Sequence, residues 1–396
     1  MENLFQSYKT HLAQTTNFAP VQLEIEKAEG IYLHDKEGKK YIDLISGVAV
    51  NNLGHRHPKI MDAIQKQLDK YLHIMVYGEF VQEETVKLAE KLASLLPTSL
   101  SSSFFVNSGS EAIEGAIKLA KLHSNRYEII SFKGSYHGST QATLSLLGDE
   151  KFKNPFRPLA PLQKQLEFNN FEQIKEITSQ TACVIIEPIQ TASGMIMPKD
   201  NFLQSVREQC NKTGVLLIFD EIQTALGRTG KLFALDYFHV VPDILCLAKS
   251  LGGGLPIGAF ISSPEIMNSL NNGHPLMGHA TTFGGHPMVC ATALATLEVL
   301  SSENYLKEIE SKSLLFRKLL VHSKIKEIRG TGFLLAVDLG NAEITQKFVE
   351  NVIPNGLITY WFLFDNTSFS IIPPLTITEE EIEESCAIIL KTLDEI

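Results

Sequence analysis

The 396-residue sequence has no apolar run of the roughly 18–20 residues that a membrane-spanning helix needs. Its first residues have neither the basic start nor the apolar core of a secretion signal. It also lacks an excess of positive charge, because 35 Lys and Arg face 45 Asp and Glu. An acidic chain is a poor partner for the phosphate backbone of nucleic acids. We therefore expect a cytoplasmic protein that binds neither membranes nor nucleic acid.

Cysteine is scarce, and its spacing excludes a disulfide framework and a Cys-rich metal site. The five cysteines are Cys183, Cys210, Cys246, Cys290 and Cys386. We expect free thiols in a reducing compartment. The 44% of hydrophobic and 20% of charged residues are ordinary for a globular protein, and the length suggests two or three structural units.

Short apolar runs alternate with helical stretches through the middle of the chain. The predicted strands are residues 104–106, 128–132, 183–186, 215–219, 244–247 and 257–261, and two of the predicted helices are 111–123 and 201–211. Continuous apolar runs are typical of strands that are buried on both faces. The pattern predicts an α/β fold with a mostly parallel sheet covered by helices.

The two ends of the chain have a different pattern. Residues 20–45 indicate strands with a hairpin turn at 35–38, and the C-terminal part predicts helices around a strand at 333–337. The first of these helices spans about 286–300, and the last begins after Thr378. Thr378 and Glu381 form a capping box, and Ile382, Cys386 and Ile389 form one apolar face. We expect a large α/β domain over residues 51–285 and a smaller α+β domain built from residues 1–50 and 286–396.

Polar groups follow several of the predicted strands, at the edge where open α/β sheets bind ligands. The segment 107–111 contains Ser108 and Glu111, which fit a capping box, and Gly109 and Ser110, which fit a phosphate site at a helix N-terminus. Both interpretations stay open on these residues alone. The segment has no Walker lysine and no G-x-G-x-x-G pattern, so a nucleotide is not indicated.

Two further positions carry charge. Asp220 directly follows an apolar strand and is followed by Glu221, but no histidine lies at ligand spacing, which disfavours a metal. Lys249 ends another apolar strand and is followed by the glycines 252–254. It is either a surface cation or a desolvated amine that can form a Schiff base.

Tyr136 and His137 follow the strand that ends at Phe132, and either could stack on a planar ligand or belong to the core. A phosphate cradle, a carboxylate, a ring and a lysine together match the needs of pyridoxal 5'-phosphate. We therefore expect this cofactor and no metal.

At this point the sequence resembles the class III aminotransferases of the aspartate-aminotransferase-like fold (fold type I), and within them the acetylornithine and ornithine branch. The resemblance runs from about Gly30 to Thr378. The segments that carry it are 43–58 (DLISGVAVNNLGHRHP), 105–118 (FVNSGSEAIEGAIK), 185–190 (IIEPIQ), 219–230 (FDEIQTALGRTG), 248–259 (AKSLGGGLPIGA) and 281–287 (TTFGGHP).

The resemblance implies a role for each matching residue. Lys249 is the lysine that carries the cofactor, Asp220 the partner of the ring nitrogen, and Tyr136 the aromatic that stacks on the ring. The other cofactor-binding residues that it implies are Ser108, Gly109, Ser110, His137, Glu187, Gln223 and Thr282. Thr282 resembles a threonine that reaches the phosphate of the neighbouring subunit, which implies a homodimer with shared active sites. The implied reaction is a ping-pong exchange between a primary amine and a 2-oxo acid.

The sequence departs from the family pattern around the substrate. Ser139 and Ser370 stand where this branch usually has arginines, and Thr191 and Ala192 stand in place of Gly-Glu. His286 replaces the asparagine of G-G-N-P. These departures favour an ω-amino substrate over acetylornithine or ornithine. Arg157 is either a replacement cation or, as we favour, a surface residue.

Two other functions fit the same cofactor residues. An aminomutase or racemase could use the same scaffold, since a fold does not fix a reaction. A non-catalytic protein that retains the cofactor is a third possibility, but the presence of Lys249, Asp220 and Tyr136 speaks against it.

Overall fold

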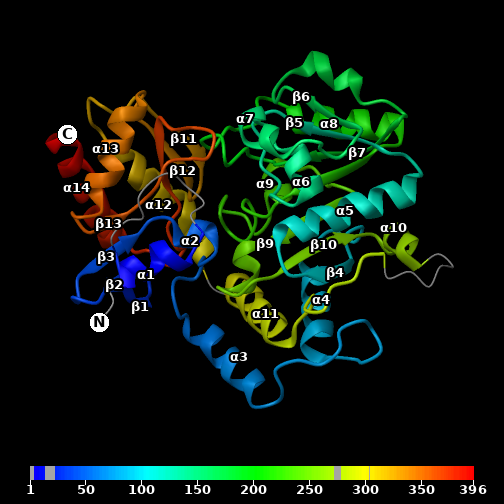
Figure 1. Cartoon of the computed structure of the whole chain (residues 1–396), viewed down its shortest axis with the longest axis horizontal. Helices are drawn as coiled ribbons and strands as arrows, with labels where there is room; N and C mark the ends of the chain where they lie inside the picture. Colours follow the sequence, from blue (N-terminus) through cyan, green and yellow to red (C-terminus); the bar gives the residue numbers. More distant parts are fainter. Residues whose placement is uncertain (1–3, 14–22, 272–277, 303) are drawn as a thin grey trace.

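The computed structural model of the chain describes residues 4–13, 23–271, 278–302 and 304–396, which form two lobes (Figure 1). The larger lobe contains a seven-stranded sheet of order β4-β10-β9-β8-β7-β5-β6. Its strands are β4 (Ser102–Val106), β5 (Glu128–Phe132), β6 (Gln163–Leu166), β7 (Thr181–Ile186), β8 (Leu216–Asp220), β9 (Ile244–Ala248) and β10 (Gly258–Ser262). Within these described ranges, no helix has the length and apolarity that crossing a membrane requires.

The sheet is mostly parallel, as predicted. Neighbouring strands from β6 to β9 pair in parallel, and only β10 is antiparallel to its neighbours β4 and β9. All six predicted strands are present within a few residues of the expected bounds. The seventh, β6, was not predicted, because its sequence QKQL lies at the sheet edge and buries only Leu166.

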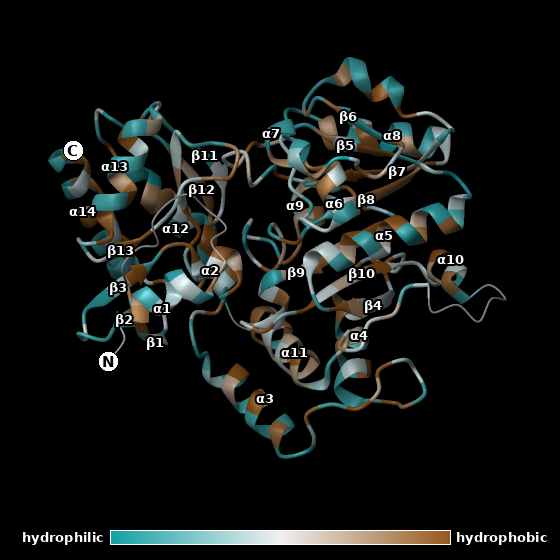
Figure 2. Cartoon of the chain, in the orientation of Figure 1, coloured by the Kyte–Doolittle hydropathy of each residue, from teal (hydrophilic) through white to brown (hydrophobic). Residues whose placement is uncertain are grey.

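Helices cover both faces of this sheet. Every residue of β7 is buried. Its alternate side chains Cys183 and Ile185 pack in the same core cluster as α5 (Gly109–Ser124), while Val184 and Ile186 pack with α8 (Phe202–Thr213). Burial on both faces explains why the strand has no polar alternation, and Figure 2 shows β7 in the hydrophobic colour. The five cysteines are buried and free, as expected.

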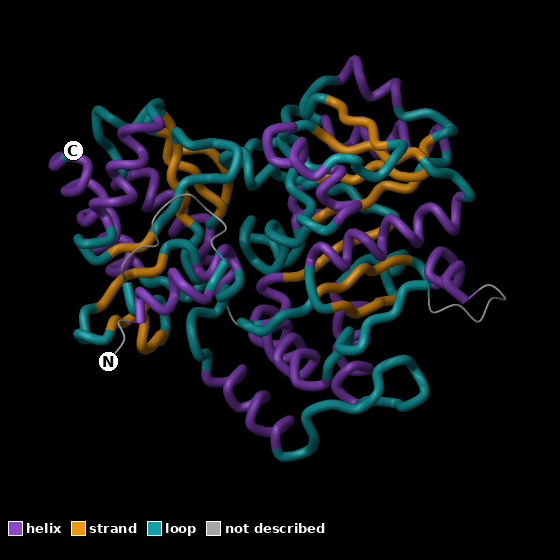
Figure 3. Tube along the Cα trace, in the orientation of Figure 1, coloured by secondary structure: helices purple, strands orange, loops and turns teal. Residues whose placement is uncertain are grey.

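The smaller lobe is built from both ends of the chain, and Figure 3 shows its strands as a group separate from the large sheet. One sheet has the order β1-β2-β3-β13, and the other has the order β11-β12-β14. The strands are β1 (Ile25–Glu29), β2 (Tyr32–Asp35), β3 (Lys40–Asp43), β11 (Glu327–Thr331), β12 (Leu334–Asp338), β13 (Leu357–Ile358) and β14 (Ser368–Ile371). The β2–β3 turn falls at the predicted 35–38, whereas residues 20–22 of the predicted segment lie outside the described residues.

The C-terminal helices of this lobe are α12 (Tyr305–Leu319), α13 (Ala342–Val352) and α14 (Glu379–Glu395), and α1 (Leu4–His11) and α2 (Ser46–Ala49) lie in the same lobe (Figure 1). The predicted capping box of α14 is confirmed, because the Thr378 side chain accepts from the Glu381 N–H and the Glu381 side chain accepts from the Thr378 N–H. Ile382, Cys386 and Ile389 are all buried, so the predicted apolar face of this helix is confirmed too.

The predicted helix near residue 286 is α11 (Pro287–Ser302), which packs on α3 (Pro58–Leu68) and α4 (Glu83–Leu95). The domain limits at residues 50 and 285 stay a prediction. The remaining elements are α6 (Gln141–Leu146), α7 (Glu150–Lys153), α9 (Ala234–Phe238), α10 (Pro264–Met267) and the 3-10 turns η1 (Asn154–Phe156), η2 (Phe171–Glu176), η3 (Lys249–Gly252) and η4 (Asn268–Asn271).

Candidate active site

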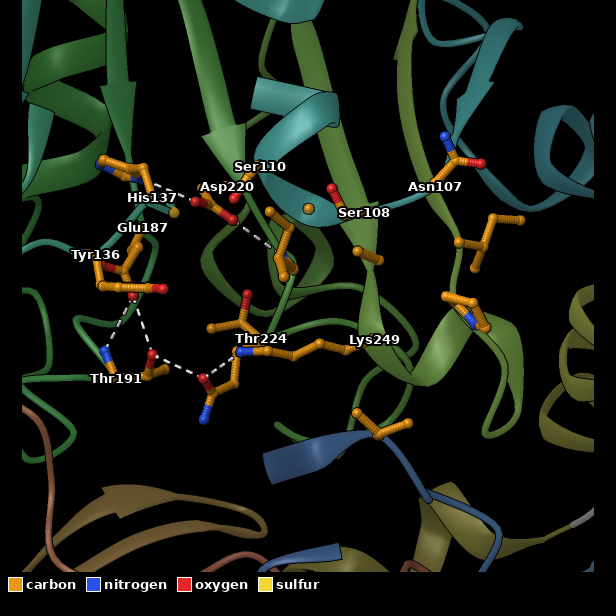
Figure 4. Close-up of a pocket in the computed structure, with 18 of the residues that line it drawn as sticks. Asn107, Ser108, Ser110, Tyr136, His137, Glu187, Thr191, Asp220, Thr224 and Lys249 are labelled. Atoms are coloured by element: carbon orange, nitrogen blue, oxygen red, sulfur yellow. Dashed lines mark hydrogen bonds and ion pairs between the residues drawn. The ribbon is translucent and has the colours of Figure 1, made fainter. Parts of the chain in front are cut away.

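One cavity of about 460 Å³ lies at the edge of the large sheet where its parallel strands end. The loops after β4, β5, β7, β8 and β9 all reach it, which is the edge where open α/β sheets bind ligands. Nine of the ten predicted site residues line it: Ser108, Gly109, Ser110, Tyr136, His137, Glu187, Asp220, Gln223 and Lys249. Figure 4 shows this cavity, with all of these residues except Gly109 and Gln223 labelled.

Asp220 ends β8 and is held by two donors. Its Oδ1 accepts the Ile222 N–H at 3.1 Å, and its Oδ2 lies 2.7 Å from His137 Nδ1. Both side chains are almost completely buried. Burial lowers the pKa of His137, but the hydrogen bond and the negative charge of Asp220 outweigh it, so the His137 pKa is raised. The pair therefore places a fixed negative carboxylate at the cavity wall.

Lys249 follows β9 directly and lines the cavity, so it is not a surface cation. Its backbone has a positive φ of 45°, which is uncommon outside glycine and is found where surrounding structure fixes a functional side chain. Its Nζ donates to Gln223 Oε1 at 2.6 Å. Desolvation lowers the pKa of Lys249 to about 8, against the opposing charges of Asp220 and Glu187. A substantial share of this amine is therefore neutral slightly above neutral pH.

Glu187 follows β7 and is buried in the wall of the same cavity as Lys249. Its Oε1 accepts the Tyr136 N–H at 2.8 Å, and its Oε2 accepts the Thr191 N–H at 3.1 Å. Burial raises the pKa of Glu187 to about 7, although the His137 charge and the two N–H groups oppose this. The carboxyl group is therefore poised between its two protonation states.

The N-terminus of α5 forms the end of the cavity where an anion fits. The Ser108 side chain accepts the Glu111 N–H at 3.2 Å, as the predicted capping box requires. The reciprocal bond differs from the prediction, because the Glu111 carboxylate accepts the Asn107 N–H at 2.6 Å. The first N–H groups of a helix have no intrahelical acceptor, so those of Gly109 and Ser110 are available to an anion.

Gly138 makes room for this end of the site. Its φ is +122°, and a Cβ at this position would lie 2.1 Å from the Ser110 Oγ. A side chain there would push Ser110 aside, so the glycine keeps the anion end of the cavity open.

Tyr136 and His137 have separate positions. Tyr136 is 37% exposed and lines the cavity, so the core interpretation of this ring is wrong. His137 is only 2% exposed and is bonded to Asp220, which places it behind the carboxylate rather than in an open stacking position.

Glu221, the second carboxylate after Asp220, has a structural role. Its oxygens accept the N–H groups of Ala234 and Leu235, at 2.6 and 2.7 Å, at the start of α9. The side chain is fully buried and does not line the cavity. Among the described residues, no group of three or more His, Cys, Asp or Glu side chains could hold a metal ion.

Thr224 is a cavity residue that the sequence analysis missed. It is 1% exposed, and its Oγ1 has no hydrogen-bond partner among the described residues. In Figure 4 its side chain lies between Asp220 and Lys249. Its place in the loop after β8 was the available clue, but sequence alone does not tell which loop side chains turn inward.

The smaller lobe contributes Val50 to the cavity. The preceding residues Ser46, Gly47, Val48 and Ala49 all have positive φ, and Val48 has a φ of 62° and is 56% exposed. A β-branched residue in this conformation is strained. Strain of this kind is concentrated at functional sites.

Thr282, the tenth predicted site residue, lies outside the cavity, and so do the three residues considered for substrate binding. Thr282 is exposed and does not line the cavity of its own chain. Arg157 is half exposed and pairs with Glu150 at 2.7 Å, so it is the surface residue that we favoured. Ser139 is exposed and Ser370 is buried in β14, and neither lines the cavity.

Comparisons with known proteins show which family the chain resembles over its length. A family model described as aminotransferase class-III matches residues 13–393. The acetylornithine aminotransferase of Methanocaldococcus jannaschii is 38% identical over 415 aligned positions, covering 100% of this chain and 98% of that protein.

Two solved structures are similar over almost the whole chain. The ornithine aminotransferase of Toxoplasma gondii, with PLP at partial occupancy in its active site, has a TM-score of 0.91 and 30% identity, covering 99% of this chain and 94% of that one. An (S)-enantioselective ω-transaminase from Thermomicrobium roseum has a TM-score of 0.91 and 27% identity, covering 99% and 98%.

Proposed function

The chain belongs to the class-III aminotransferases, which are enzymes that transfer amino groups, and from this premise we propose its cofactor and substrate class. It takes the amino group from a primary amine, preferably an ω-amine, and gives it to a 2-oxo acid in a ping-pong reaction. Pyridoxal phosphate is the cofactor. The observation that carries this proposal is the Lys249 amine, 2.6 Å from Gln223, in one cavity with the Asp220–His137 pair.

The donor set fits each part of this cofactor. The start of α5 suits the phosphate, the Asp220 carboxylate suits a protonated ring nitrogen, and the exposed face of Tyr136 suits the ring. Lys249 supplies the amine that holds the aldehyde carbon. When bound, pyridoxal phosphate supplies an aldehyde that combines with amines and a ring that accepts an electron pair.

The side chains of this chain have separate tasks in the reaction. Asp220 holds a proton at the ring nitrogen, and His137 and the Ile222 N–H fix the direction of its carboxylate. Lys249 moves a proton at the reacting carbon of the substrate, because an amine with a pKa of about 8 is both a usable base and a usable acid near neutral pH. Gln223 holds its Nζ in place.

The substrate preference follows from what surrounds this lysine. Of the described residues that line the cavity, none is an arginine, and Lys249 is the only lysine. A substrate carboxylate in a closed pocket needs a cation or several donors, and a bidentate arginine is the usual strong solution. The chain therefore selects only weakly for substrates with a carboxylate. It favours ω-amines over substrates whose carboxylate is bound by arginines in the family.

We expect acetylornithine and ornithine to be used less efficiently than 4-aminobutyrate, β-alanine or a simple aryl amine. Replacing a charge-assisted hydrogen bond by a neutral one loses roughly 1 kcal/mol, which corresponds to about a fivefold loss in kcat/KM for each such bond. For the same reason, pyruvate, with one carboxylate, should serve as well as 2-oxoglutarate, with two. The measurement is kcat/KM for each amine with each acceptor.

Arg157→Ala is the matched control, and it should leave this ranking unchanged because Arg157 is paired with Glu150 outside the cavity. A strong preference for acetylornithine in both proteins would contradict the substrate assignment. A further assay without any 2-oxo acid distinguishes amino transfer from isomerisation. An aminotransferase stops after one turnover, because no acceptor is present, whereas an aminomutase or racemase continues. Continued turnover would therefore overturn the proposed function.

We also propose that the active unit is a homodimer in which Thr282 reaches the cofactor phosphate of the partner. The exposed position of Thr282 outside its own cavity supports this. The neighbouring Thr281 Oγ1 accepts from the Asn107 side chain at 2.6 Å, which ties this loop to the edge of the phosphate end. Cofactor affinity and dimerisation are then linked by mass action.

Thr282→Ala should weaken cofactor binding by about tenfold to a hundredfold, the loss expected for one hydrogen bond to a charged group. Equilibrium binding of the cofactor measures this, and sedimentation with and without the cofactor measures the dimer. Thr178→Ala is the control, because Thr178 is an exposed threonine that does not line the cavity. Unchanged affinity in Thr282→Ala, or a fully active monomer, would refute the shared site.

A further inference from the structure

Four side chains form a continuous line of hydrogen bonds from Glu187 to Lys249 (Figure 4). The Thr191 Oγ1 lies 3.0 Å from Glu187 Oε2 and 3.2 Å from Gln223 Oε1. The same Gln223 oxygen accepts from Lys249 Nζ at 2.6 Å. The Thr191 hydroxyl therefore lies at the centre of this line, between the Glu187 and Gln223 oxygens.

A threonine hydroxyl has one proton, and here it lies between two acceptors. When Glu187 is a carboxylate, the charge-assisted bond is the stronger one, so Thr191 donates to Glu187. When Glu187 is protonated, its own O–H donates to Thr191 Oγ1, and the Thr191 proton turns to Gln223 Oε1. The hydroxyl direction therefore follows the charge of Glu187.

Thr191 is well placed to make this exchange. It is 4% exposed, and its backbone N–H donates to Glu187 Oε2 at 3.1 Å, which holds the residue against the carboxyl group. Both acceptors are within reach without a change of backbone position. Valine has the same shape as threonine without the hydroxyl, so the line can be broken without a new cavity.

We propose that Thr191 is a positioning residue whose hydroxyl couples the charge state of Glu187 to the hydrogen bond that holds the Lys249 amine. This inference rests on the proposed function, because it assigns a task within the same site. Thr191 acts through Gln223 and does not touch the reacting atoms.

The charged groups around Glu187 allow both of its states near neutral pH. The charge of His137 lowers the pKa of Glu187 and that of Asp220 raises it, and the Glu187 charge in turn raises the pKa of Lys249. The pKa of Glu187 is raised by burial to about 7, and desolvation, with a smaller contribution from Arg228, lowers the pKa of Lys249 to about 8. The two titrations are therefore close enough to influence each other.

The test compares Thr191→Val, Thr191→Ser and wild type as holoenzymes. The first readout is the pH midpoint of the visible absorption of the bound cofactor. The second is the pH dependence of Lys249 labelling by an amine reagent in the full chain after cofactor removal. Thr345→Val is the matched control, because Thr345 is a buried threonine whose hydroxyl donates to Asn341 O and Thr367 O in the smaller lobe.

In Thr191→Val, the Glu187 carboxylate loses its hydroxyl donor, so Glu187 keeps its proton to a higher pH and its negative charge supports the charged form of Lys249 less. Both midpoints should therefore move to lower pH by about half to one unit, the shift that corresponds to one neutral hydrogen bond. Thr191→Ser should restore the wild-type midpoints, and Thr345→Val should leave them unchanged. In a Glu187→Gln background, Thr191→Val should cause a smaller shift, because the charge that it relays is gone.

Wild-type midpoints in Thr191→Val would overturn the inference, and so would a shift that Thr191→Ser fails to restore. A shift of the same size in the Glu187→Gln background would also overturn it, since the coupling would then not pass through Glu187. If wild type transfers amino groups and Thr191→Val has the same two pH midpoints as wild type, only this inference fails. If wild type neither binds cofactor at Lys249 nor transfers amino groups, the proposed function fails.

Discussion

Lys249→Ala should lose amino transfer almost completely, while the chain stays folded and binds the cofactor only non-covalently. The structure places this amine at 2.6 Å from Gln223 in the cavity, and alanine leaves no other lysine among the described lining residues. General acid–base catalysis alone contributes about 10²–10⁴-fold. Loss of the covalent nucleophile adds to that, so we expect a decrease in kcat of about 10³-fold or more.

Borohydride reduction followed by peptide mapping tests the assignment directly, and in wild type the label should lie on the peptide that contains Lys249. Lys133→Ala is a suitable control, because Lys133 follows β5 but is exposed and paired with Glu167. This control should keep both the label and the activity. Label on any other lysine of the wild-type chain would show that the assignment is wrong.

Asp220→Asn should slow the chemical step while the shape of the site is kept. Asparagine has the size of aspartate but not its charge, so the ring nitrogen loses the group that keeps it protonated. Removal of one preorganised electrostatic partner costs about 10²–10³-fold in rate. His137 loses its carboxylate partner in the same variant, and its pKa should fall because only the Glu187 charge then opposes burial.

Single-turnover mixing of the holoenzyme with an amine isolates this step from product release. Asp243→Asn is the matched control, since Asp243 accepts from Arg207 and from the Leu217 N–H at the opposite end of the same strands. It should affect stability without affecting the rate of the chemical step. A wild-type rate in Asp220→Asn would eliminate the proposed role of the carboxylate.

Buried strands were predictable from sequence, whereas the polar edge strand β6 and the short strand β13 were not. Residues 181–186 and 244–248 are buried at every position, so each is a continuous apolar run. The edge strand Gln163–Leu166 is mostly half-exposed, and the two-residue strand Leu357–Ile358 is too short to produce a pattern. In both cases the pairing with a neighbouring strand, rather than the local sequence, determines the structure.

Part of the candidate site followed from the same logic, because the polar residues at 108–110, 136–137, 220 and 249 follow strands that end at one edge, whereas Glu187 and Gln223 were found only through the family resemblance. What sequence could not give was the pairing across the sheet. His137 and Asp220 are 83 positions apart, and their contact depends on a strand order that does not follow the chain order. The inward position of Thr224 and the bond from Glu111 to Asn107 depend on side-chain directions in loops, which no residue pattern encodes.

The pairing of β13 with β3 also affects the order in which the chain folds during its synthesis. Leu357 lies beside Ile42, and the Ile42 N–H donates to Gly356 O at 2.9 Å, so the first sheet is completed by residues that are synthesised long after its early strands. At synthesis rates of roughly 5–20 residues per second, the early strands wait on the order of 15–60 s for this partner. Every segment of the large sheet emerges during that interval. Until residues 357–358 emerge, the β3 edge of the smaller lobe has no partner on that side, so this lobe closes only after the strands of the large sheet have been synthesised.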